Sequence, residues 1–179
     1  MTNSATSSVA AVNADLVDRA IGQCIHALEG LSSDDLHHVP YASGNSIGFN
    51  VWHIARTIDN VLFFVFDRET PLWLQQSFND RFDLPKVAQG TGMSTEEAQA
   101  LHFPEPAVFI EYLEALRAAA RPRLEAMSDD YLAEVVTLKP WGERPRLAHI
   151  GQVLIAHSNQ HLGMVSMARA LLGHNDLGF

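Results

Sequence analysis

Four stretches of the chain place apolar residues at the 3.6-residue period of an amphipathic α-helix, and this pattern limits the possible folds more than any other feature. The predicted helices run from about residue 14 to 29, from 46 to 67, from just after Pro104 to about Leu124, and from about 146 to 173. Only EVVTLKPWGERPRL has extended character, and it suits a short hairpin rather than a sheet. We therefore predict an all-α protein, an antiparallel four-helix bundle with long crossover connections.

The segments outside the helices differ in character. Residues 1–11 are rich in Ser, Thr, Asn and Ala and are predicted to form a flexible leader, which leaves residues 12–179 as a single helical domain. Residues 70–92 lack a clear period and are broken by Pro, Gly and Asn, which is more typical of a functional or lid-like connection than of a simple linker. Ser94 and Glu97 have the spacing of a capping box for a further short helix.

The charge and cysteine content argue against several classes of function. The net charge of −9 disfavours nucleic acid and anionic membranes as partners, because neither attracts an acidic surface. No apolar run approaches the roughly 20 residues that span a bilayer, and the N-terminus lacks the basic start and apolar core of a signal peptide. The single cysteine, Cys24, lies in an apolar helical pattern and is predicted to be a buried structural thiol. These features predict a cytoplasmic protein.

The stretch IAHSNQHLGM in the last predicted helix carries two histidines, His157 and His161, on its apolar side. A helical wheel puts both rings on the arc formed by Leu147, Ile150, Leu154, Val165, Ala168 and Leu172. Residues four apart have Cβ atoms about 6 Å apart on one face, so the two imidazoles can reach one metal ion. The alternative is a pair of core histidines satisfied by hydrogen bonds, because each buried polar ring needs a partner.

His53 in the second predicted helix is a candidate for a third ligand. It lies beside the apolar arc on a half-polar flank, which suits either the wall of a pocket or an ordinary boundary histidine. Three neutral histidines around a metal leave a coordination position open for water or substrate, which is typical of a reactive site. The other six histidines are predicted to lie at the surface: His26, His37, His38, His102, His149 and His174.

Several side chains near these histidines are candidates for supporting roles. Arg56 and Asp59 fall on the side of the second helix opposite its apolar arc and are predicted to form a surface ion pair, with a cosubstrate carboxylate as the alternative partner of Arg56. A ligating imidazole normally donates its other N–H to a partner. Candidates for that partner are Asn50, Thr57 and Gln160. Candidates for either the pocket entrance or the core are Trp73, Phe78 and Phe82.

The segments NSIGFNVWHIARTIDN and AHSNQHLGM, separated by a PLW segment and a long third helix, resemble the DinB/YfiT-like superfamily. The most specific parts are N-S-I-x(5)-H-I-A-R in the second helix and H-x(3)-H-x-G in the fourth, and the resemblance covers about Val12 to Gly173. It implies a four-helix bundle with a three-histidine metal centre. Carried over residue by residue, the implied ligands are His53, His157 and His161.

The resemblance also bears on activity. The family includes transferases and isomerases that use low-molecular-weight thiols such as mycothiol, bacillithiol or glutathione, an iron-binding domain of sulfoxide synthases, and proteins known only as damage-inducible. It implies a divalent metal ion, zinc or nickel first, with iron or manganese as alternatives. It also implies a homodimer, for which the run FFVF offers an apolar face unless the middle segment buries it.

We expect a small-molecule thiol and an electrophile as partners. Three alternatives stay open: a non-catalytic metal- or ligand-binding protein, a metal-dependent hydrolase, and a bundle in which the histidines serve stability alone.

Overall fold

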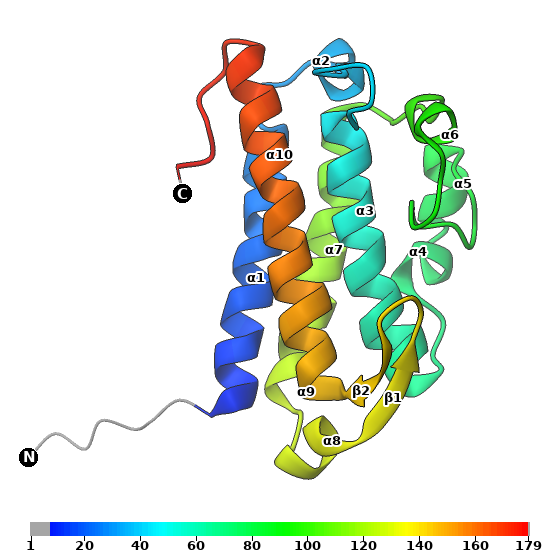
Figure 1. Ribbon diagram of the computed structural model, residues 1–179, viewed down its shortest axis with the longest axis vertical. Helices are drawn as coiled ribbons and strands as arrows, with labels where there is room; N and C mark the ends of the chain where they lie inside the picture. The colour runs from blue at the N-terminus through cyan, green and yellow to red at the C-terminus, as the bar shows by residue number, and fades with distance from the viewer. Residues whose placement is uncertain (1–7, 179) are drawn as a thin grey trace, which may run out of the picture.

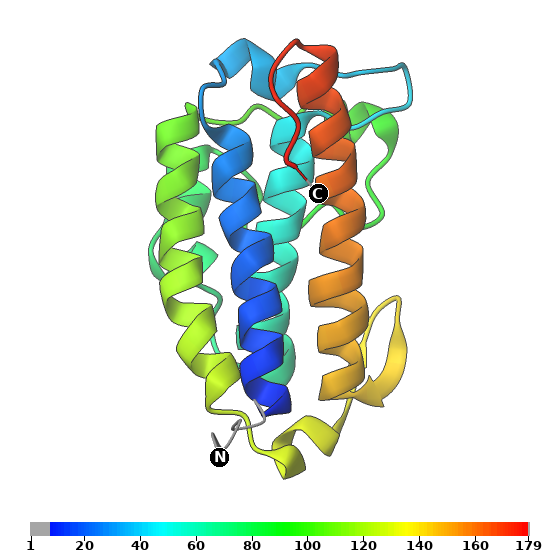
Figure 2. The same cartoon turned by 90° about the vertical axis from the view of Figure 1, so that its left-hand side faces the viewer.

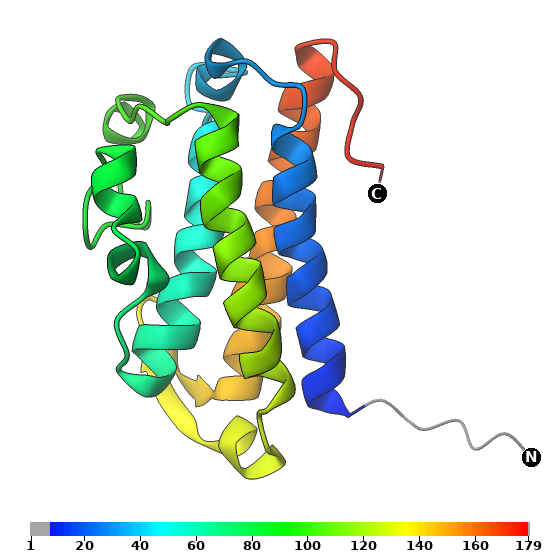
Figure 3. The ribbon, with the colours of Figure 1, turned by 180° about the vertical axis from the view of Figure 1, so that it is seen from behind.

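The computed structural model describes residues 8–178 and contains a bundle of four long helices (Figure 1). These helices are α1 (Val9–Leu28), α3 (Ile47–Asp59), α7 (Pro106–Glu125) and α10 (His157–Leu171). α1 packs antiparallel to α7, and α3 packs antiparallel to α10 (Figure 1 and Figure 3). The predicted all-α bundle with long crossover connections is confirmed.

Side-chain caps fix where the helices begin. Ser8 caps α1, because its Oγ accepts a hydrogen bond from the backbone N–H of Ala11 at 3.1 Å. The helix therefore begins at Val9, earlier than predicted, and takes in the end of the predicted leader. Residues 1–7 of that leader lie outside the described residues. Ser46 caps α3 in the same way, through the backbone N–H of Phe49.

The chain crosses from the end of α3 to the start of α7 along the outer side of α3 (Figure 1). This middle segment contains three short helices, of which the first two make residues 70–92 more regular than predicted and the third is the short helix predicted after Ser94. They are α4 (Leu72–Gln75), α5 (Phe78–Phe82) and α6 (Thr95–Gln99). Asp59 ties the segment to the bundle, since its carboxylate accepts the backbone N–H groups of Leu72 and Trp73, each at 2.8 Å, at the start of α4.

Two further short helices and one hairpin lie in the connections between the long helices. They are α2 (Ser33–His37), α8 (Asp129–Ala133), β1 (Val135–Leu138) and β2 (Gly142–Pro145). The predicted hairpin is confirmed, with Leu138 paired opposite Gly142, and it stands beside the start of the last helical stretch (Figure 2). The predicted capping box of Ser94 and Glu97 is present at α6. Among the described residues, no helix is both long and apolar enough to cross a membrane.

The middle segment buries the side of α3 that the sequence predicts to be exposed. Arg56 and Asp59 form the predicted ion pair, with Nη1 3.5 Å from Oδ2, but the predicted surface position is wrong, because the two residues are only 1% and 0% exposed. Trp73 of α4 covers the guanidinium at 4.9 Å, and the Tyr112 hydroxyl of α7 donates to the Asp59 carboxylate at 2.9 Å. Burial raises the pKa of Asp59, and the Trp73 N–H and Arg56 counteract this.

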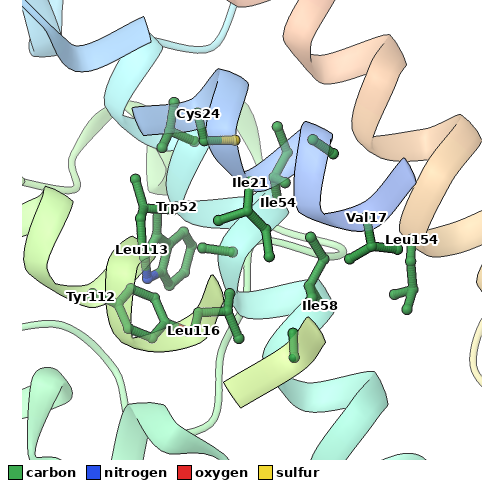
Figure 4. Packing of buried hydrophobic residues seen from close by; sticks show 14 of the residues in the cluster. Val17, Ile21, Cys24, Trp52, Ile54, Ile58, Tyr112, Leu113, Leu116 and Leu154 are labelled. Carbon is green, nitrogen blue, oxygen red and sulfur yellow. The ribbon is translucent and has the colours of Figure 1, made fainter. Parts of the chain in front are cut away.

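The hydrophobic core lies between the long helices (Figure 4). Its labelled side chains come from α1, α3, α7 and the stretch that leads into α10: Val17, Ile21, Cys24, Trp52, Ile54, Ile58, Tyr112, Leu113, Leu116 and Leu154. Cys24 is fully buried, as predicted, and burial raises the pKa of its thiol. Trp73, Phe78 and Phe82 pack on Tyr112 with ring centroids 4.8 to 6.0 Å away, so they belong to the core.

A π-helix in the last helical stretch changes which residues face the core. α9 (Arg146–His149) leads directly into η2 (Ile150–Ala156) and then into α10, and a second π-helix, η1 (Asn60–Val65), extends α3. A π turn holds more residues than an α turn, so residues before η2 are rotated relative to a regular wheel. Two predictions are wrong for this reason. Leu147, expected in the core, is 40% exposed, and His149, expected at the surface, is fully buried.

Candidate metal centre

Three histidine side chains from two antiparallel helices meet between α3 and α10. His53 projects from α3, while His157 begins α10 and His161 follows one turn later. One nitrogen from each ring lies within 4.8 Å of the others, and these three residues form a group that could hold a metal ion. The structure thus brings together the three histidines that the sequence singles out. His53 is buried, and the other two are half-buried.

The Nε2 atoms of the three rings face one another. Nε2 of His157 lies 3.3 Å from Nε2 of His53 and 3.1 Å from Nε2 of His161. Around a tetrahedral zinc ion with Zn–N bonds of about 2.0–2.1 Å, ligand nitrogens are about 3.3–3.4 Å apart. The observed spacing therefore fits one metal ion bound by three imidazoles, with little adjustment of the side chains.

The partner of His53 fixes which ring nitrogen carries the proton. Nδ1 of His53 makes a short contact with the backbone carbonyl oxygen of Gln89. A carbonyl oxygen can only accept, so Nδ1 carries the hydrogen and Nε2 of the neutral ring presents a lone pair. The backbone of the middle segment thereby sets the tautomer that a metal ligand needs.

Asn50 does the same for His161. Its Nδ2 group donates to the carbonyl oxygens of Ser46 at 2.9 Å and Asn45 at 3.3 Å, which turns its Oδ1 towards the ring. Nδ1 of His161 lies 2.7 Å from this Oδ1 and therefore donates to it. Nε2 of His161 then also presents a lone pair. His157 differs, because its Nδ1 has no hydrogen-bond partner among the described residues.

The electrostatics of the cluster favour neutral rings. Burial lowers the pKa of His53, and burial together with the neighbouring His53 ring lowers the pKa of His157 to about 4 and of His161 to about 3. Two of the three facing nitrogens lack a proton, so at most one N–H···N bond can form through His157. A cation placed between the nitrogens would satisfy all three lone pairs.

The histidines form one wall of a cavity of about 340 Å³. The loop from residue 89 to 95 and the hairpin tip from residue 138 to 141 supply other walls. At the tip, the Trp141 ring stands edge-on to His157, with centroids 5.8 Å apart. Thr57, one turn after His53, also lines the cavity, and its buried Oγ1 has no hydrogen-bond partner among the described residues. The site can therefore admit a small molecule next to the three nitrogens.

The loop comes closest to His53 at Gly90. This residue has φ +94°, and a Cβ atom built on it would lie 2.9 Å from His53 Nδ1 and 2.9 Å from Phe49 Cζ. Only glycine fits this conformation and this approach. Gln89 and Gly90 were not predicted as parts of the site, because their only signal in the sequence is the turn composition QGTG.

The supporting candidates from the sequence have mixed outcomes. Asn50 does contact a histidine ring, but this ring is that of His161 and not that of His53, which is nearer in the sequence. Thr57 lines the cavity without a hydrogen bond to any ring. Gln160 is exposed and does not line the cavity. The hairpin residues Lys139 and Trp141, which do line it, are missed, because nothing in the chain near them indicates a site.

Comparisons with known proteins agree with this architecture. The family profile of the DinB superfamily matches residues 16–165. A solved structure of a conserved protein from Enterococcus faecalis superposes with a TM-score of 0.81 at 22% sequence identity, over 94% of this chain and 99% of that one. At this identity the likeness concerns the fold alone. No curated protein matches the sequence.

Proposed function

Because the chain belongs to the DinB superfamily, we propose that it is a divalent-metal-dependent transferase or isomerase that acts with a low-molecular-weight thiol. The observation that carries this proposal is the convergence of three histidine nitrogens at the wall of a cavity. Three protein ligands leave a position for an exogenous ligand, as in catalytic rather than structural sites. Zinc or nickel is the proposed ion, with iron or manganese as alternatives, because imidazole suits several first-row metals.

His53, His157 and His161 would hold a divalent ion here, and its chemistry would be to lower the pKa of a bound thiol, whose thiolate is the nucleophilic form. The chain itself supplies orientation. Gln89 and Asn50 accept the Nδ1 protons of His53 and His161 and so hold both Nε2 atoms towards the cavity. The Thr57 hydroxyl, which has no partner of its own in the described structure, is available to donate a hydrogen bond to a molecule in the cavity.

We further propose small-molecule partners, a thiol and an electrophile, because a cavity of about 340 Å³ suits ligands of that size. The cytoplasmic location and the absence of nucleic-acid and membrane partners stay predictions.

The homodimer also remains a proposal, with a changed contact surface. The run FFVF is largely buried within the protein, because Phe63 and Phe66 are only 5% and 4% exposed. Phe64 is the one exposed residue of the four. On α10, Met164, Met167 and Leu171 are exposed along one side and offer an apolar stripe for a second copy. Sedimentation of the native protein beside Met167→Glu tests this contact. A native monomer would contradict it.

Metal analysis tests the central proposal. Purified native protein is expected to hold about one divalent ion per chain, and His53→Ala and His157→Ala are expected to lose it. His26→Ala serves as a matched control, because His26 is exposed and hydrogen-bonded only to Glu29. No bound ion after incubation with zinc, nickel, iron or manganese would refute the proposal.

Turnover then separates an enzyme from a metal- or ligand-binding protein with the same ligands. The native protein and the histidine variants are assayed with thiols and electrophiles. Thiol-dependent product formation, absent from the variants, supports the transferase or isomerase. Metal-dependent product formation without a thiol would instead favour the hydrolase.

A further inference from the structure

The charge distribution around the cavity differs from that of the whole chain. The protein has 21 Asp and Glu residues against 12 Lys and Arg, yet no carboxylate of residues 8–178 lines the cavity. Apart from the three histidines, Lys139 is the one ionisable side chain of the described residues in its walls. Lys139 is also one of only two lysines in the sequence, the other being Lys86.

Lys139 stands at the tip of the β1–β2 hairpin, between two residues that are held in place. Leu138 before it is 6% exposed and packs in the core. Trp141 after it packs against the ring of His157. These two contacts keep the tip beside the histidines, and they leave the Lys139 side chain exposed. Within the described residues, Lys139 forms no ion pair, whereas six of the ten arginines do.

We propose that the ligand of this cavity carries an anionic group, such as a carboxylate, and that Lys139 binds it. The proposal rests on the function proposed above, because it assumes that the rest of the ligand reaches the histidines. An ammonium group is a compact point charge that pairs with carboxylate or phosphate. Because no acidic side chain of the described residues lines the cavity wall and competes, an anion from solution is the natural partner of Lys139. Lys139 is thus a specificity-determining residue that selects acidic over neutral or basic ligands.

Three six-carbon thiols that differ only in the charge of the far end test this selection. They are 6-mercaptohexanoate, 6-mercaptohexanol and 6-aminohexanethiol. Cobalt(II)-substituted protein reports binding through the cobalt–sulfur charge-transfer absorption, so no turnover is needed. For the native protein the carboxylate is expected to bind about fivefold more tightly than the alcohol, and the amine more weakly than either.

Lys139→Gln is expected to abolish this preference, and Lys139→Glu to reverse it. Lys86→Gln is the matched control: it changes the net charge by the same amount, but Lys86 is exposed and does not line the cavity. Equal affinity of the native protein for the three thiols would overturn the inference while leaving thiol binding intact. So would a preference that survives in Lys139→Gln, or one that is lost equally in Lys86→Gln.

A measurement on metal-free protein tests the anion site at Lys139 separately from thiol binding at the histidines. Trp52 and Trp73 are fully buried, so Trp141 in the cavity wall is the tryptophan that a quencher in solution can reach. In metal-free protein at low ionic strength, iodide quenching is expected to fall about 1.5-fold in Lys139→Gln, with quenching by neutral acrylamide unchanged. Absence of any cobalt–thiol absorption would refute thiol binding, and iodide quenching unaffected by Lys139→Gln would then overturn the anion site as well.

Discussion

Replacing Gly90 by alanine tests whether the middle loop controls the histidine cluster. A Cβ atom at this position would lie 2.9 Å from His53 Nδ1 and from Phe49 Cζ, about 0.6 Å closer than ordinary non-bonded contacts allow. The loop must therefore move outwards, and the carbonyl of the preceding residue, Gln89, moves with it. Gly92 provides a matched control, because it also has a left-handed φ, +80° against +94°, but nothing lies within 4 Å of its Cβ position.

The two substitutions share a backbone cost and differ in the crowding at His53. Both place alanine in the left-handed region, which costs about 1–2 kcal/mol of folding free energy. Only Gly90→Ala displaces the acceptor of the His53 Nδ1 proton. Loss of such an outer partner typically weakens metal binding about 10–100-fold, or about 1.4–2.7 kcal/mol. We expect that loss in Gly90→Ala, and zinc affinity close to native in Gly92→Ala.

Zinc affinity is measured by competition with a chromophoric chelator, and folding stability by urea denaturation of the metal-free proteins. The denaturation measurement gives the backbone cost from Gly92→Ala and the further cost of crowding from the extra loss in Gly90→Ala. Equal zinc affinities of Gly90→Ala and Gly92→Ala would refute the role assigned to the Gln89 carbonyl. A Gly90→Ala variant that is as stable as Gly92→Ala would contradict the crowding at His53.

Three further predictions follow from the buried and charged groups. Asp59→Ala leaves the guanidinium of Arg56 buried without its carboxylate, so urea denaturation is expected to show a loss of about 3–5 kcal/mol, and a loss below about 1 kcal/mol would contradict the buried network. Thr57→Val removes a hydroxyl that has no hydrogen-bond partner in the described structure, so stability and metal content are expected to be unchanged. The affinity of the cobalt-substituted protein for a thiol is expected to weaken about 2–10-fold. An unchanged thiol affinity would show that Thr57 does not contact the ligand. The hydrogen bond from Arg117 lowers the pKa of Asp18. The pair therefore stabilises the folded protein fully above about pH 4, and this stabilisation is lost as the pH falls through the lowered pKa. If the unfolding free energy of Asp18→Asn has the same pH dependence as that of the native protein, this prediction is refuted.

Much of the architecture follows from local sequence. Apolar residues at a 3.6-residue period specify helices whose apolar sides must pack together, and serine caps mark their starts. The pair His157 and His161 is also local, because two residues four apart on one regular helix always share a face. The hairpin at residues 135–145 follows in the same way from β-branched residues next to proline and glycine.

The mistaken predictions arise where distant segments or irregular backbone decide the outcome. Leu147 is exposed and His149 is buried, the reverse of the prediction, because the π-helix η2 rotates the residues before it. A π turn holds more residues than an α turn, and no local signal in the sequence marks where it occurs. The burial of Arg56 and Asp59 depends on the middle segment folding over α3, which a helical wheel of α3 alone cannot represent.

The sequence by itself thus determined a helical bundle with two histidines on one face of its last helix. The family resemblance added His53 as a third ligand, but only the tertiary structure decided that the three rings meet, that the Gln89 carbonyl sets the tautomer of His53, and that Lys139 reaches the same cavity. The physical reason is the separation along the chain over which each effect acts. Helix period and capping act over a few residues of chain, whereas a site of this kind joins groups 36 and 104 residues apart, and only the packing of whole helices brings such groups together.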